Sequence, residues 1–173
     1  MNLEAEILKE YSKRQTVRIA AWIGGDRARF KLLMELFLHG DGCLSQRAAW
    51  ILSHCEENHP ELITPWLKQM INKMQEPGVH DAVKRNVVRI LQCIDIPPAL
   101  QGAVTSLCFD YLSSPATPIA VKANAMTVLL NIVERKPDLK HELQMIIEQM
   151  LPYVGPALQS RGKKVLRHLA RKT

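Results

Sequence analysis

Cysteine is scarce in this chain of 173 residues, which holds Cys43, Cys55, Cys93 and Cys108. These residues form no Cys-x-x-Cys pair and have no zinc-ligand spacing, so the sequence predicts no metal site. His54 stands next to Cys55, but a lone His-Cys pair without a partner at helical spacing is interpreted as structural. We expect reduced and mostly buried thiols, as is typical of a cytoplasmic protein.

Long apolar runs are also absent. No segment approaches the roughly 18 consecutive apolar residues of a membrane-spanning helix. The stretch from Met1 to Arg18 mixes acids and bases, and it lacks the apolar run and small-residue cleavage site of a signal peptide. The sequence therefore predicts no membrane association, and we expect cytoplasmic localisation.

Motifs of catalysis and cofactor binding are missing as well. The chain contains no Gly-x-Ser-x-Gly, no His-Glu-x-x-His and no glycine-rich phosphate loop. The glycines at Gly24-Gly25 and Gly40-Asp41-Gly42 read as turns, because no Lys-Ser or Lys-Thr follows them. We therefore assign no catalytic residue and no cofactor, and we favour a non-enzymatic interpretation.

What the sequence does contain is repetition. Ala82-Val83-Lys84-Arg85-Asn86 recurs 38 residues later as Ala120-Val121-Lys122-Ala123-Asn124. Pro60-Glu61-Leu62 recurs as Pro98-Ala99-Leu100 and Pro137-Asp138-Leu139, at spacings of 38 and 39. A period of this size is typical of stacked helical repeats that bury a shared core. No window shows the apolar and polar alternation of a strand. The sequence predicts one all-α domain over residues 1–173, with about nine or ten helices and no sheet.

Several helix boundaries can be predicted from local signals. Ser12 and Asp26 are expected to cap helices that end at Ile23 and His39, and Thr117 is expected to cap a helix that starts at Pro118. Prolines are expected at the first position of four further helices, at Pro60, Pro98, Pro137 and Pro156. The helices with predicted bounds are 3–11, 12–23, 27–39, 43–58, 60–74, 80–94, 98–112, 117–134, 137–153 and 156–171.

These repeats resemble a known family. The openings Pro-x-Leu and Val-Lys, and the segments Gln46–Ser53, His80–Asn86 and Leu107–Phe109, are similar to HEAT-type repeats and to a family of uncharacterised bacterial HEAT-like proteins. The resemblance implies an α–α superhelix, a HEAT- or armadillo-like right-handed solenoid of antiparallel helix pairs. It also implies that the second helices line a concave face and that the protein is a binding scaffold.

A polar line beside the buried stripe supplies the candidate site. If Val121 and Ala125 face the core, positions 124, 127 and 131 form a line of neighbours on the same helix. Aligned through the repeat, with Lys84 and Lys122 beside it, this line gives the candidate binding residues of the concave face: Arg47, Trp50, His54, Asn86, Arg89, Asn124, Arg161 and Lys164.

Several candidates also have a structural interpretation. Arg47, Asn86, Asn124 and Arg161 could form a ladder of hydrogen bonds to carbonyls of the neighbouring repeat, since buried polar groups require partners. Trp50 fits the core better than a ligand stack, because aromatic side chains dominate core burial.

Acidic residues are missing from the C-terminal segment. Residues 158–173 carry six bases, while the rest of the chain balances 17 bases with 17 acids. The six bases are Arg161, Lys163, Lys164, Arg167, Arg171 and Lys172. Such a patch attracts phosphate or an acidic protein surface; the alternative is a solvated helix that caps the array.

Two functions follow from this pattern. The first is a non-enzymatic scaffold whose concave face binds a partner peptide or protein surface. The alternative is DNA binding or repair, because the fold also occurs in HEAT-like alkylbase glycosylases, with Trp22, Trp50, Arg47, Arg89 and the C-terminal bases as the residues that would act. No motif maps that family's residues onto this chain.

Overall fold

The computed structural model describes residues 1–171, so Lys172 lies outside it. The described residues form helices, turns and loops, with no strand among them. The chain divides into two compact units, unit 1 (Met1–Ile90) and unit 2 (Leu91–Thr173). Unit 1 holds α1 (Leu3–Lys9), α2 (Lys13–Ile23), α3 (Arg27–His39), α4 (Gly42–Asn58), α5 (Pro60–Ile63), η1 (Thr64–Trp66), α6 (Leu67–Met74) and α7 (Asp81–Leu91), which ends at the boundary. Unit 2 holds α8 (Pro98–Ser113), α9 (Ile119–Val133), η2 (Pro137–Leu139), α10 (Lys140–Met150), η3 (Leu151–Tyr153) and α11 (Pro156–Arg171).

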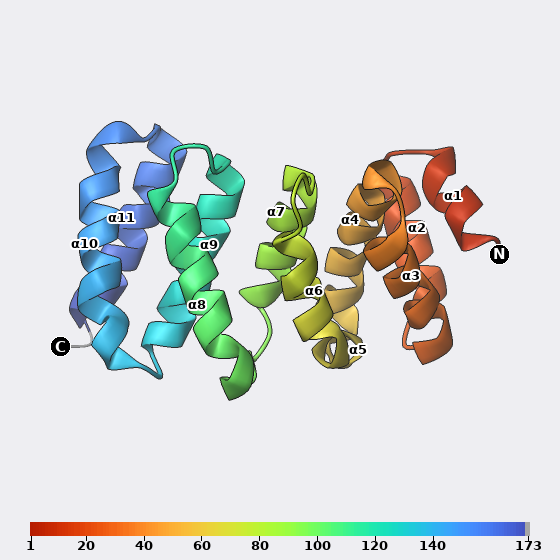
Figure 1. Cartoon of the computed structure of the whole chain (residues 1–173), viewed down its shortest axis with the longest axis horizontal. Coiled ribbons are helices and arrows are strands. Elements are labelled where there is room, and N and C mark those ends of the chain that lie inside the picture. The colour runs from red at the N-terminus through yellow and green to blue at the C-terminus, as the bar shows by residue number, and fades with distance from the viewer. Residues whose placement is uncertain (172–173) are drawn as a thin grey trace. The chain divides into compact units, whose positions relative to one another are not determined.

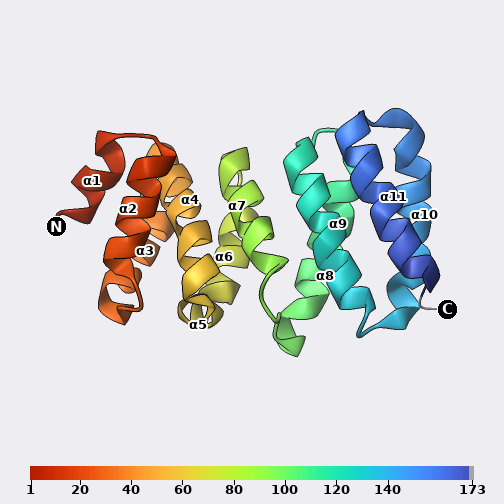
Figure 2. The same ribbon diagram turned by 180° about the vertical axis from the view of Figure 1, so that it is seen from behind.

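Each unit is built from two layers of helices. In unit 1, α3 and α6 lie in front in Figure 1, while α2, α4 and α7 lie in front in the reverse view of Figure 2. In unit 2, taken by itself, α8 and α10 form one layer, and α9 and α11 form the other. Successive helices pack as pairs, such as α3 with α4, α8 with α9, and α10 with α11. The predicted antiparallel helix pairs are therefore present.

Side-chain caps fix the starts of several helices. Ser12 Oγ accepts a hydrogen bond from the Gln15 N–H at 3.1 Å, and Asp26 Oδ1 accepts from the Ala28 N–H at 2.8 Å. Both caps confirm the sequence prediction. The cap predicted at Thr117 is wrong. Pro118 occupies the N-cap position with extended backbone (φ −58°, ψ 147°), and no side chain caps α9.

Prolines interrupt two helices that the sequence predicts as continuous. The predicted helix 60–74 is divided into α5 and α6 by the 3₁₀ turn η1, which contains Pro65. The predicted helix 137–153 begins with η2 and ends with η3, which contains Pro152. Proline lacks the N–H of the helical ladder and its ring collides with the preceding turn, so a tighter turn replaces the α-helix there.

The core follows the predicted stripe. Val121, Ala125 and Val128 are fully buried in α9, and Val83 is 1% exposed in α7. The thiols divide evenly instead of being mostly buried: Cys55 and Cys108 are buried, whereas Cys43 and Cys93 are exposed. Burial raises the pKa of both buried thiols to about 12. Burial therefore keeps them in the protonated form.

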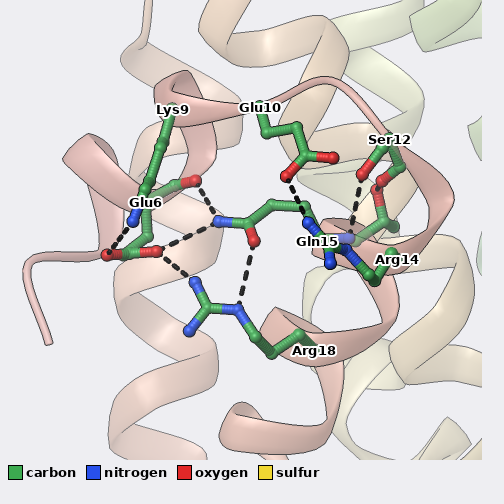
Figure 3. Close-up of polar contacts among 8 residues, drawn as sticks. Glu6, Lys9, Glu10, Ser12, Arg14, Gln15 and Arg18 are labelled. Atoms are coloured by element: carbon green, nitrogen blue, oxygen red, sulfur yellow. Dashed lines mark hydrogen bonds and ion pairs between the residues drawn. The ribbon is translucent and has the colours of Figure 1, made fainter.

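A polar network joins α1 to α2 (Figure 3). The buried Gln15 amide donates to the Glu6 carbonyl at 2.7 Å and to the Glu6 carboxylate at 3.0 Å. Arg18 donates to the same carboxylate and to the Gln15 side-chain oxygen. The hydrogen bonds from Gln15 and Arg18 lower the pKa of Glu6. This network fixes the end of α1 against the second helix.

Candidate interaction surface

In unit 1, three of the predicted residues meet in a hollow of about 710 Å³ on the layer of α2, α4 and α7. We call it the α2–α4 hollow. Its predicted members are Trp50 and His54 from α4 and Arg89 from α7, and its other lining residues are Lys13, Val17, Ala20, Ala21, Gly24, Cys55, Glu57, Asn58 and His59. Trp50 and His54 lie one helical turn apart, so α4 presents both to the same side. The periodicity thus predicted residues that share a surface.

The charges in the α2–α4 hollow are largely compensated. The Arg89 guanidinium donates to Glu57 Oε1 at 2.6 Å, and His54 Nδ1 lies 3.2 Å from Glu57 Oε2. Desolvation, with the charge of Glu57 beside it, raises the pKa of the buried Glu56. The hollow therefore combines a paired carboxylate with apolar wall residues such as Val17, which is 45% exposed.

Trp50 lies at the surface of this hollow and not within the core. Its side chain is half-buried, and its ring meets the Tyr11 ring edge to face at a centroid distance of 5.3 Å. Such edge-to-face pairs are favourable because of the ring quadrupoles. Trp50 is therefore a partly buried residue that lines the hollow, and its role in binding stays a prediction.

Arg47 takes the structural role that the ladder interpretation describes. Its Nη1 donates to the Leu8 carbonyl at 2.9 Å and to the Ile7 carbonyl at 3.2 Å. These carbonyls belong to the last turn of α1, where helix geometry leaves acceptors without a partner. The guanidinium also lies 5.3 Å from the Tyr11 ring centroid. Arg47 thus joins α1 to α4.

The ladder does not extend to Asn86. Its side chain is 3% exposed and donates to the Ala82 carbonyl of its own helix at 2.9 Å. This burial removes Asn86 from the candidate surface. A bond of the ladder type occurs instead at Asn131, whose amide donates to the Gln92 carbonyl 39 residues earlier at 2.9 Å.

In unit 2, Arg161 and Lys164 line a second hollow, of about 340 Å³, between α9 and α11. We call it the α9–α11 groove. Its other lining residues are Thr127, Leu130, Val165, Arg167, His168 and Arg171. Arg161 Nη1 donates to Thr127 Oγ1 at 2.8 Å, so this base contacts a hydroxyl and not a carbonyl of the ladder. Asn124 is half-buried in α9 and does not line the groove.

The repeat pattern did not predict the residues that α2 contributes to the α2–α4 hollow. Lys13 and Val17 belong to that helix, which stands before the first repeat that the alignment covered. Their exposure could not be read from periodicity, because an apolar Val17 on an amphipathic helix is predicted to face the core. Glu57 was also missed, although its pairing with Arg89 sets the charge of the hollow.

Within residues 1–171, no three His, Cys, Asp or Glu side chains gather where they could hold a metal ion. No helix in the same range has the length and apolar character needed to cross a membrane.

The paired helices, the two-layered units and the repeated core stripe together define an all-α helical repeat protein. A family model described as a HEAT repeat domain matches residues 3–169, and the chain belongs to this family. HEAT repeats are helical scaffolds for protein interaction. Comparison with curated proteins and with solved structures returns no match.

Proposed function

We propose that this protein is a non-enzymatic scaffold that binds a peptide or loop of a partner protein on the layer of second helices. The observation that carries the proposal is the α2–α4 hollow, where Trp50, His54 and Arg89 meet the exposed Val17. A half-buried aromatic ring and an arginine are the residue types that dominate binding energy at interfaces. The surrounding apolar walls and paired charge suit a segment with mixed apolar and polar side chains.

Two residues of the DNA-repair alternative, Arg47 and Trp22, lie outside the α2–α4 hollow. Arg47 is held by the carbonyls of α1. Trp22 is half-buried outside the hollow, with the Arg29 guanidinium 4.6 Å from its ring centroid. Because these side chains pack against their own unit, we do not propose glycosylase activity.

Peptide selection on the full chain tests the proposal. Peptides selected from a random library displayed on phage are measured by calorimetry against the wild type and against Val17→Lys, which places an ammonium group in the hollow. We expect micromolar binding that Val17→Lys weakens by about tenfold, a loss of about 1.4 kcal/mol. Leu32→Lys is the matched control, because Leu32 is 54% exposed on α3 and does not line the hollow. Selected peptides that bind both variants as tightly as the wild type, or turnover of a substrate by the purified protein, would overturn the proposal.

A further inference from the structure

The bases of α11 are arranged on one face of that helix. Arg161, Lys164, His168 and Arg171 follow one another at intervals of three, four and three residues. At 3.6 residues per turn, this spacing gives a single stripe, and ten residues span about 15 Å along the axis. The stripe lines the α9–α11 groove, and Figure 2 shows the two helices side by side. The α9–α11 groove is therefore lined by a short row of bases.

Three of the four bases in this stripe have no carboxylate partner within residues 1–171, and only His168 has one. The segment 156–171 contains no Asp or Glu. Glu134, at the end of α9, lies 2.8 Å from His168 Nε2. Within residues 1–171, no ion pair joins Arg161, Lys164 or Arg171 to a carboxylate. The α2–α4 hollow differs, because Glu57 there pairs with Arg89.

Two bases elsewhere in the chain contact the carboxyl ends of helices. Arg29 donates to the Trp22 carbonyl at 2.6 Å, and Lys73 donates to the Leu38 carbonyl at 2.9 Å. A cation near the carboxyl end of a helix stabilises it, because that end carries partial negative charge. Arg161 and Lys164 cap no helix end in residues 1–171, whereas Arg171 lies in the last turn of α11 and also stabilises that end. The charges of Arg161 and Lys164 are therefore available to a ligand.

The groove fits an anionic protein segment better than a nucleic acid. Its lining includes the half-buried Leu130, which offers an apolar contact between the bases. No aromatic side chain lines it within the described residues, whereas single-stranded nucleic acids are bound by stacking on aromatic rings. Outside the C-terminal segment the charges balance, so no long basic footprint continues for a duplex.

We infer that the α9–α11 groove binds an acidic segment of a partner protein, with carboxylates on Arg161, Lys164 and Arg171 and an apolar side chain over Leu130. This inference rests on the proposed function, because it names the class of partner segment that such a scaffold takes. A segment with acids at helical spacing matches the stripe, since both repeat along an axis at the same rise per residue. Opposite charge also accelerates the encounter of the two surfaces.

Fluorescence anisotropy with three labelled probes tests the groove. The first probe is a helical peptide of about 14 residues with glutamates and leucines at helical spacing, which spans about 20 Å. The second is the same peptide with glutamine in place of each glutamate. The third is a DNA duplex of about 20 base pairs. At an ionic strength of about 0.15 M, we expect the acidic peptide to bind and Lys164→Glu to weaken it by about tenfold.

Lys163→Glu is the matched control. Lys163 is the neighbouring exposed base on the same helix and does not line the groove. Lys163→Glu changes the net charge by the same amount as Lys164→Glu. We expect it to weaken peptide binding by less than about threefold, because solvent screens a charge outside the groove. Equal weakening by both variants, equal binding of the glutamine peptide, or preferential and salt-dependent DNA binding through Lys164 would each overturn the inference.

Val17→Lys in the same assay separates the two proposals. Acidic-peptide binding that Lys164→Glu weakens by about tenfold and Val17→Lys leaves unchanged supports the groove. Binding that responds to Val17→Lys and not to Lys164→Glu overturns the groove and leaves the proposed function in place. Unchanged circular dichroism of each variant shows that the fold is retained.

Discussion

Single basic residues in this chain differ in what they contact, and this difference decides their role. Arg47 donates to the last carbonyls of α1, and the buried Lys122 donates to the Leu112 carbonyl at the end of α8 at 3.2 Å. Desolvation lowers the pKa of Lys122, because burial disfavours the charged ammonium. Arg161 and Lys164 remain exposed. Residue type alone therefore does not identify a binding residue here.

A buried thiol gives a test at the same scale. Burial raises the pKa of Cys55 to about 12 in the folded state, whereas a thiol in the unfolded chain titrates near about 8.5. The folded state thus binds the proton more tightly, and stability is lost as the pH rises above the unfolded value. The wild type should lose unfolding free energy between about pH 8.5 and 10. We expect this loss to be smaller by about 1–2 kcal/mol in Cys55→Ala.

Urea denaturation at the two pH values checks this expectation. Cys43→Ala is the control, since Cys43 is exposed, and we expect it to keep the wild-type pH dependence. The same pH dependence in the two variants would contradict the assigned burial of Cys55.

At the scale of the helix, the sequence predicted where helices begin better than where they are interrupted. The bounds of α3 and α11 agree with prediction, because Asp26 and Pro156 are local signals read in the first turn. The break at Pro65 was missed, since the apolar pattern continues on both sides of it. The polar line was predicted as a surface, but Asn86 is buried because α7 turns that side chain inward.

Two helical glycines allow a matched test of how α11 packs. A Cβ at Gly162 in α11 would lie 2.7 Å from Leu151 Cδ2 and 3.1 Å from Ile147 Cγ2, whereas a Cβ at Gly102 in α8 would meet nothing within 4 Å. We expect Gly162→Leu to destabilise the protein by about 1–3 kcal/mol through overpacking. Gly102→Leu should stabilise it by about 0.5–1 kcal/mol, because leucine favours the helix.

Chemical denaturation of both variants measures these two effects. Similar free energies of unfolding for Gly162→Leu and Gly102→Leu would show that α11 does not approach η3 and α10 closely.

At the scale of the whole molecule, the prediction of one domain is still to be tested. The chain forms two compact units, and each buries apolar residues of its own. The family model nevertheless runs without interruption from residue 3 to residue 169. Repeat arrays unfold together when each repeat stabilises the next.

Calorimetry distinguishes one cooperative domain from two independent ones. We expect a single thermal transition with a calorimetric to van't Hoff enthalpy ratio of about 1. Two transitions, or a ratio of about 2, would show that units 1 and 2 unfold separately. The isolated segment 1–90 provides a reference for the unfolding of unit 1.

The sequence by itself determined the repeat period, the buried stripe of Val83 and Val121, and the confinement of net charge to the last helix. These features depend on local signals, namely helical periodicity, first-turn prolines and composition. Only the tertiary structure decided which polar side chains are available, because their partners lie 32 to 40 residues away: Glu57 for Arg89, and Leu8 for Arg47. The sequence placed these residues on one line, but hydrogen bonds between distant helices determine which of them a partner can contact.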